Sequence, residues 1–143
     1  ASRPEAKLYL VGTSPSPAVR SLQSAGITVT GFVPSMSEYL RRARLFAAPL
    51  FAGGGLQNKL LEAMAVEVPV LTTPHANLSL GGVDGESLRL AEDAPSFADR
   101  ICELLAAPQA AAQLGQAGQR HVRNNFRWET ATAQLEAVLQ GVS

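Results

Sequence analysis

Three consecutive glycines and an acidic residue shortly after them are the residues of this sequence best suited to binding chemistry. Gly53, Gly54 and Gly55 follow the apolar run 44–50 and lead directly into LQNKLLEAMA, a segment with helical spacing. Because glycine has no Cβ, backbone N–H groups at the start of a helix can converge there on an anion such as phosphate. The sequence therefore predicts a phosphate site at this loop, and the alternative is that the glycines only permit a tight turn.

Glu62 and Lys59 are predicted to face away from the core, because the apolar stripe of that helix consists of Leu60, Leu61 and Met64. A carboxylate can accept hydrogen bonds from two neighbouring sugar hydroxyls, and Lys59 supplies a nearby positive charge. The simpler alternative is an exposed ion pair between the two side chains, worth about 0.3 to 0.5 kcal/mol. Spacing alone leaves both interpretations open.

Two well-known phosphate-binding motifs do not match this sequence. Lys59 follows Asn58 and precedes Leu60, so the Gly-Lys-Ser/Thr end of a nucleoside-triphosphate P-loop is absent. The segment VGTSPSP, which follows the first apolar run, does not match the GxGxxG pattern of dinucleotide-binding proteins.

The elements that must position these residues alternate along the chain. Short apolar runs at 7–12, 27–32, 44–50, 68–73 and 87–91 are predicted strands, and stretches with helical spacing separate them. Runs that are apolar throughout are typical of parallel strands covered on both faces. We therefore expect an α/β fold, a Rossmann-like doubly wound parallel sheet flanked by helices. Three helical segments, 95–106, 108–124 and 128–140, form a predicted helical C-terminal tail over about 95–140, and residues 1–143 are predicted to be one domain.

Composition excludes several function classes. The 143 residues carry twelve basic and twelve acidic side chains, so no broad basic field attracts nucleic acid. The single cysteine, Cys102, cannot form an internal disulfide and fits a reducing compartment, so we expect a cytoplasmic protein with no metal site. The longest apolar runs fall far short of the roughly 20 residues of a membrane helix. The chain starts at Ala1 and reaches an apolar run within seven residues, so we expect a fragment of a longer protein.

The segment APLFAGGGLQNKLLEAMAVEVPVLTT resembles the signature of the family 4 glycosyltransferases, which runs strand, PS or PL, a Gly-rich loop and LEAMAxGxPVV. The closing RHVRNNFRWETATAQLEAVL is similar to the tail of that family. The QNKxLEAMA variant is most similar to bacterial sugar transferases of exopolysaccharide and PEP-CTERM-associated systems. The resemblance implies the C-terminal, donor-binding half of a two-domain GT-B enzyme, without its N-terminal acceptor domain and without a central strand that precedes residue 1.

The resemblance also implies roles for individual residues. Glu62 would hold the ribose hydroxyls of a nucleotide sugar, and the turn with Phe32 and Val33 would meet the base. The diphosphate and sugar would be lined by Gly53, Gly54, Gly55, Leu56 and Gln57, with Lys59 as the basic residue near the loop. Many members carry another glutamate eight positions before the one matched by Glu62, and here that position is Gly54. The sequence therefore names no catalytic residue, and it implies no cofactor, because the nucleoside-diphosphate sugar is the donor substrate.

The expected function is that of a retaining glycosyltransferase, which transfers a sugar to a hydroxyl acceptor in polysaccharide or glycoconjugate synthesis. The chain alone is expected to be inactive. It is also expected either to form a homodimer or to depend on residues outside it. The full-length protein is expected in the cytoplasm or at the inner face of the membrane. The alternatives are a GT-B-like nucleotide-sugar epimerase and a non-catalytic flavodoxin-like interaction module.

His75 follows the fourth predicted strand, where it either contacts a ligand or is merely solvated. Its solvated state is the expectation for a loop histidine.

Overall fold

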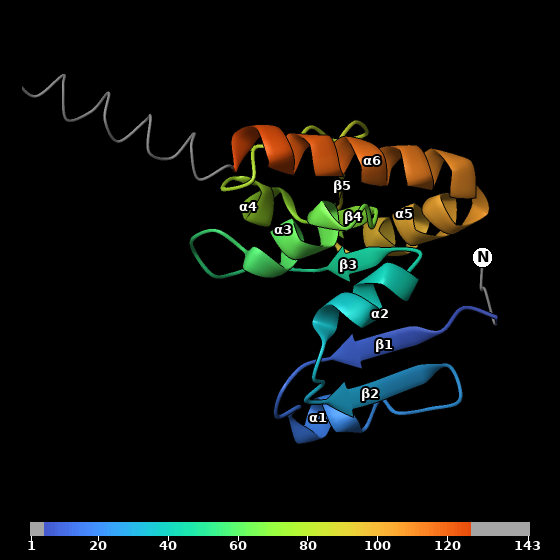
Figure 1. The fold of residues 1–143 in the computed structure, drawn as a ribbon. Coiled ribbons are helices and arrows are strands. Elements are labelled where there is room, and N and C mark those ends of the chain that lie inside the picture. The colour runs from blue at the N-terminus through green and yellow to red at the C-terminus, as the bar shows by residue number, and fades with distance from the viewer. Residues whose placement is uncertain (1–4, 127–143) are drawn as a thin grey trace, which may run out of the picture. The chain divides into compact units, whose positions relative to one another are not determined.

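The computed structural model describes residues 5–126, and the chain divides into two compact units, Ala1–Tyr39 and Leu40–Ser143. Each unit is described by itself. Strands and helices alternate along the chain through β5, and helices α5 and α6 follow (Figure 1).

Unit 1 contains a two-stranded parallel sheet. Strands β1 (Leu8–Val11) and β2 (Ile27–Gly31) pair with Leu8 opposite Ile27, and the short helix α1 (Pro17–Arg20) lies between them in sequence. Ser16 starts α1 because its hydroxyl accepts a hydrogen bond from the N–H of Val19 at 3.3 Å. Helix α2 (Met36–Arg42) crosses the boundary of the two units.

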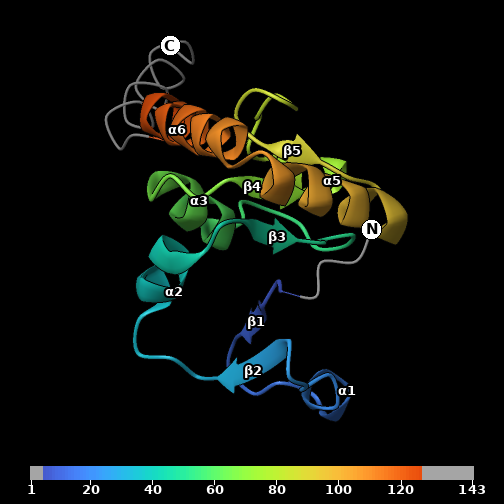
Figure 2. The same ribbon diagram turned by 90° about the vertical axis from the view of Figure 1, so that its right-hand side faces the viewer.

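Unit 2 contains a three-stranded parallel sheet in the order β3-β4-β5. Its strands are β3 (Phe46–Ala48), β4 (Val70–Thr72) and β5 (Arg89–Leu90), and β4 is buried along its whole length. Its helices are α3 (Asn58–Ala65), α4 (Pro74–Asn77), α5 (Ala94–Ala106) and α6 (Pro108–Asn125). Figure 2 shows α3, α5 and α6 around the strands of this unit. Helix α3 thus connects β3 to β4, as expected for a βαβ unit.

The core of unit 2 lies between its sheet and helices. Leu60 and Met64 of α3 are fully buried, as is Leu71 of β4. Helix α6 packs on α3, and its Gly115 lies against the backbone just after α3, where a Cβ would be 2.0 Å from the carbonyl oxygen of Glu67. The inward stripe predicted for α3 is therefore confirmed for Leu60 and Met64, whereas Leu61 is only half-buried.

The predicted strands are confirmed in number and parallel direction, and α5 and α6 match the first two predicted tail helices. The third, 128–140, lies outside the described residues. Helix α4 was not predicted, because its four residues are too few to show a periodic pattern. The five strands of the described residues form two sheets, whereas a single sheet was expected. The resemblance implies a further central strand that precedes residue 1. That strand and the single-domain organisation stay predictions.

The expectation that every strand is covered on both faces is wrong for β1. Leu8 is 47% exposed and Tyr9 is 51% exposed. The described part of unit 1 adds only one strand and short helical segments to β1, which is too little structure to cover two faces of a sheet.

Candidate functional site

The glycine loop, residues 51–57, connects the carboxyl end of β3 to the start of α3. Gly53 and Gly55 have φ values of 106° and 81°, in the region that side chains with a Cβ rarely adopt. Gly54 has no such φ, and a Cβ placed on it would meet nothing within 4 Å. The loop therefore depends on glycine at two positions, and Gly54 adds open space beside the backbone.

The backbone N–H groups of this loop are free to bind a ligand. Among the hydrogen bonds of residues 5–126, none is donated by a backbone N–H of residues 51–59, and the first donors in α3 are Leu60 and Leu61. The helix begins at Asn58 rather than directly after Gly55, so Leu56 and Gln57 belong to the loop. Gln57 occupies the N-cap position without a side-chain cap, which leaves the helix terminus open to an external acceptor.

A second segment, α4 with the residues around it, holds the loop. His75 Nε2 lies 2.6 Å from the carbonyl oxygen of Gly53, and the hydroxyl of Ser79 donates to the carbonyl of Gly55 at 3.2 Å. Thr73, at the start of α4, donates to the carbonyl of Leu50. The expectation of a merely solvated His75 is therefore wrong, although its side chain is exposed. Sequence analysis missed Thr73 and Ser79 altogether, since nothing in local spacing marks a contact across more than 20 residues.

The loop and α4 enclose a small hollow of about 100 Å³. It is lined on one side by Gly53, Gly54 and Gly55, and on the other by His75 and Ser79. Pockets that enclose whole small-molecule ligands have volumes of roughly 300 to 1,000 Å³. This hollow therefore has room for only one part of a nucleotide sugar.

Glu62 and Lys59 are both exposed, as predicted. Within the described residues they form no ion pair with each other, so the simpler interpretation of their spacing is not realised. Glu62 lies one turn beyond the start of α3 and faces away from the buried Leu60 and Met64. Its carboxylate is thus available to accept hydrogen bonds from a ligand near the helix N-terminus.

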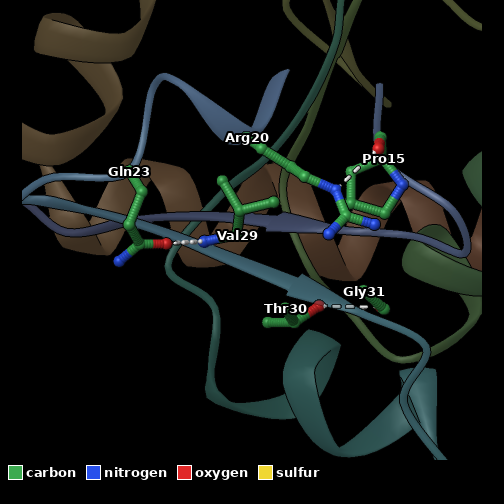
Figure 3. Close-up of a pocket in the computed structure, with 6 residues that line it drawn as sticks. All are labelled: Pro15, Arg20, Gln23, Val29, Thr30 and Gly31. Atoms are coloured by element: carbon green, nitrogen blue, oxygen red, sulfur yellow. Dashed lines mark hydrogen bonds between the residues drawn. The ribbon is translucent and has the colours of Figure 1, made fainter. Parts of the chain in front are cut away.

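In unit 1, the turn predicted to meet a base follows β2 directly. Gly31 ends the strand with a φ of 72°, Phe32 is 74% exposed and Val33 is half-buried. Beside this turn lies an open hollow of about 430 Å³ that the sequence did not predict (Figure 3). Arg20, the last residue of α1, and Gln23, which follows the helix, both line this hollow. Arg20 Nε donates to the carbonyl of Pro15 at 3.0 Å, and the side-chain oxygen of Gln23 accepts from the N–H of Val29 at 2.7 Å.

The predicted site residues are therefore divided between the units. Phe32 and Val33 belong to unit 1, whereas Lys59 and Glu62 and the glycine loop belong to unit 2. Within unit 2 the structure brings the loop and the first turns of α3 together. In the part of the chain that the structure describes, no three His, Cys, Asp or Glu side chains gather where they could hold a metal ion.

A protein-family model described as "Glycosyl transferases group 1" matches residues 1–107. The chain belongs to this family. The resemblance noted from the glycine loop and LEAMA is thereby confirmed, and family membership favours a glycosyltransferase over both an epimerase and an interaction module.

The chain is similar in sequence to two bacterial mannosyltransferases. The chain is 31% identical over 107 residues to a GDP-mannose-dependent α-(1-6)-phosphatidylinositol monomannoside mannosyltransferase of Mycolicibacterium smegmatis, covering 69% of this chain and 28% of the relative. It is 28% identical over 162 aligned positions to a GDP-mannose-dependent monoacylated α-(1-6)-phosphatidylinositol monomannoside mannosyltransferase of Corynebacterium glutamicum. This match covers 98% of this chain and 40% of the relative. The chain therefore spans less than half the length of either relative.

Among solved structures, Anabaena HepE in complex with UDP has a TM-score of 0.84 at 18% identity, covering 97% of this chain and 42% of that one. The same protein in complex with UDP-glucose gives a TM-score of 0.81 at 19% identity. At this identity the likeness shows the fold alone, and it confirms the expected parallel α/β architecture.

No helix within residues 5–126 is both long and apolar enough to cross a membrane.

Proposed function

We propose that this chain is the donor-binding half of a retaining glycosyltransferase, which transfers a sugar from a nucleoside diphosphate to a hydroxyl acceptor. The observation that carries the proposal is the row of backbone N–H groups from residue 51 to residue 59, which donate no hydrogen bond within residues 5–126 and include the open N-terminus of α3. Family membership and the nucleotide ligands named for HepE support the same assignment.

The glycine loop would bind the diphosphate. When the bond between the sugar and the diphosphate breaks, negative charge develops on the leaving diphosphate. N–H groups that are already oriented stabilise this charge without further reorganisation, and the helix N-terminus adds a partial positive charge. The loop would therefore stabilise the transition state more than the bound donor, as catalysis requires.

Glu62 would hold the ribose. Its exposed carboxylate has no partner among the described residues and offers two acceptor oxygens to a vicinal diol. Lys59, one turn earlier on the same helix, adds positive charge near the diphosphate. Phe32 and Val33, at the end of β2, would supply backbone groups to the base.

The acceptor site would come from a separate domain, as the resemblance to two-domain GT-B enzymes implies. No resident metal or cofactor is part of the proposed reaction. We place the enzyme in the cytoplasm or at the inner face of the membrane, in polysaccharide or glycoconjugate synthesis. The chain by itself is expected to bind donor and to show no sugar transfer in an assay with radiolabelled nucleotide sugar.

Binding measurements can determine which base the donor nucleotide carries. The two relatives are named for GDP-mannose, whereas HepE was solved with UDP. Titration of the chain with UDP, GDP and ADP at up to millimolar concentration should raise the melting temperature with one of them, since a ligand that binds only the folded state stabilises it. No response to any of the three would contradict the proposal.

A variant of Glu62 tests how the nucleotide is held. Glu62→Ala should weaken binding by about tenfold or more, because it removes charge-assisted hydrogen bonds to the ribose. The same variant should bind the nucleoside diphosphate and its 2′-deoxy analogue equally, whereas the unchanged chain should prefer the ribonucleotide. Glu92→Ala, at an exposed glutamate just after β5, is the matched control and should leave both affinities unchanged. Equal discrimination in Glu62→Ala and the unchanged chain would contradict the ribose role.

A further inference from the structure

Among the described residues, no backbone hydrogen bond joins two residues of the glycine loop, and the side chains of His75 and Ser79 hold it through two contacts, termed the grip. His75 Nε2 lies 2.6 Å from the carbonyl oxygen of Gly53, and Ser79 Oγ lies 3.2 Å from that of Gly55. These carbonyls belong to the two loop residues with positive φ, so the grip acts where the backbone takes its least usual conformation. Gly54, between them, is left without a side-chain contact.

The two contacts also fix which groups of the loop remain free. A carbonyl oxygen only accepts hydrogen bonds, so His75 must carry its proton on Nε2. The single hydroxyl proton of Ser79 is shared between the carbonyl of Gly55 at 3.2 Å and that of Ala76 at 3.3 Å. The donors occupy the carbonyls of Gly53 and Gly55, and among the described residues no backbone N–H of residues 51–59 donates a hydrogen bond, so these N–H groups are available to an external acceptor.

The segment that provides the grip is itself well anchored. Thr73 is buried; its hydroxyl donates to the carbonyl of Leu50 and accepts from the N–H of Ala76 at 3.2 Å. Ala76 and Leu80 are 5% and 2% exposed, and the Asn77 side chain both accepts from and donates to the backbone of Gly82. His75 and Ser79 thus extend from a fixed support toward an otherwise weakly held loop.

We propose that His75 and Ser79 are positioning residues, which hold the glycine loop in the conformation that presents its N–H groups to the diphosphate. This inference rests on the proposed function. A loop that is already ordered loses less conformational entropy when the ligand binds, so each hydrogen bond to the loop raises nucleotide affinity without touching the nucleotide.

The test compares variants of the 143-residue chain in two measurements. His75→Phe keeps a ring and removes the donor, whereas His75→Gln supplies an amide donor of similar reach; Ser79→Ala removes the other contact. His121→Phe is the matched control, because His121 Nε2 makes the same kind of bond, at 2.8 Å, to the carbonyl of Leu80 and not to the loop. The measurements are hydrogen exchange of the amides of residues 51–59, without ligand, and the dissociation constant of whichever of UDP, GDP or ADP the unchanged chain binds.

We expect His75→Phe and Ser79→Ala each to speed exchange of the loop amides and to weaken nucleotide binding by about fivefold, the loss of one ordinary hydrogen bond. His75→Gln should restore both values, and His121→Phe should leave both unchanged. Unaltered loop exchange in both His75→Phe and Ser79→Ala would overturn the grip. Faster exchange with unaltered affinity would overturn its role in binding. Failure of the unchanged chain to bind any of the three nucleotides would instead overturn the proposed function, while the exchange measurement would still decide the grip.

Discussion

At the scale of single residues, the three glycines of the loop have different reasons to be glycine. Gly53 and Gly55 need a positive φ, whereas Gly54 has no positive φ and a Cβ added there would meet nothing within 4 Å. In the family signature a glutamate often stands at the position of Gly54, where the backbone of this chain has room for a Cβ.

This difference predicts the stability of three alanine variants. Gly53→Ala and Gly55→Ala should each lower the free energy of unfolding by about 1 to 2 kcal/mol, because alanine is strained at positive φ. Gly54→Ala should change it by less than about 0.5 kcal/mol. Urea unfolding of the three variants checks this order, and an equal loss at all three positions would contradict the loop geometry.

Sequence reasoning was strongest where a residue's role follows from its immediate neighbours. The exposure of Lys59 and Glu62 followed from the helical spacing of Leu60 and Met64, and the structure agrees. The contacts of His75 and Ser79 could not be found in this way, because their partners lie 22 and 24 residues earlier. Such contacts depend on which loops meet at the edge of the sheet, and local periodicity does not contain that information.

At the scale of elements, each helix end depends on particular groups. Helix α5 starts with a capping box, in which the Asp93 carboxylate accepts from the Ser96 N–H at 2.8 Å and the Asp93 N–H donates to the Ser96 hydroxyl at 3.1 Å. Hydrogen bonding to Ser96, first through its side chain and then through its backbone, holds the pKa of Asp93 below its ordinary value of 3.8.

The lowered pKa of Asp93 predicts a pH dependence. The charged carboxylate stabilises the folded chain above the ordinary aspartate pKa, and this contribution is lost as pH falls through the lower folded value. Asp93→Asn keeps a cap acceptor but cannot titrate there, so its urea midpoint should fall less than that of the unchanged chain between about pH 5 and pH 2. Parallel loss of stability in the two proteins would show that the cap does not depend on the charge.

Helix α3 ends in a conformation that favours glycine but contains Glu67. Its φ is 63°; its N–H bonds the carbonyl of Met64, and the N–H of Val68 bonds that of Ala63, the pattern of a Schellman motif. The family signature LEAMAxGxPVV has glycine at this position.

Glu67→Gly should therefore raise the free energy of unfolding by about 1 kcal/mol, by relieving the strain at a positive φ. Glu38→Gly, in the ordinary helical backbone of α2, is the control and should lower it by a similar amount. Chemical unfolding measures both, and a loss of stability in Glu67→Gly would contradict this explanation.

At the scale of the whole molecule, the two units differ in how well they are packed. Every described residue that is buried lies at or after Leu40, and the described part of unit 1, residues 5–39, contains none. The alternation of strands and helices was predictable from apolar runs, but their division into two sheets was not, since it depends on which strands pair.

This difference predicts that unit 1 opens first. Amides of β1 and β2 should exchange hydrogen at least about tenfold faster than those of β4, because a two-stranded sheet without buried side chains is only marginally stable. Hydrogen exchange resolved by residue checks this prediction. Equal protection of β2 and β4 would mean that unit 1 is stabilised by contacts beyond those of its described residues.

The central claim is that the N–H groups of the glycine loop bind the diphosphate of a nucleotide sugar. Titration of the ¹⁵N-labelled chain with UDP and GDP, followed through its backbone amide resonances, tests it most directly. One of the two nucleotides should shift the resonances of residues 53–59 in a saturable manner, whereas uridine and guanosine, which lack the diphosphate, should leave those resonances unchanged. Saturable binding that shifts other residues but leaves 53–59 in place would contradict it.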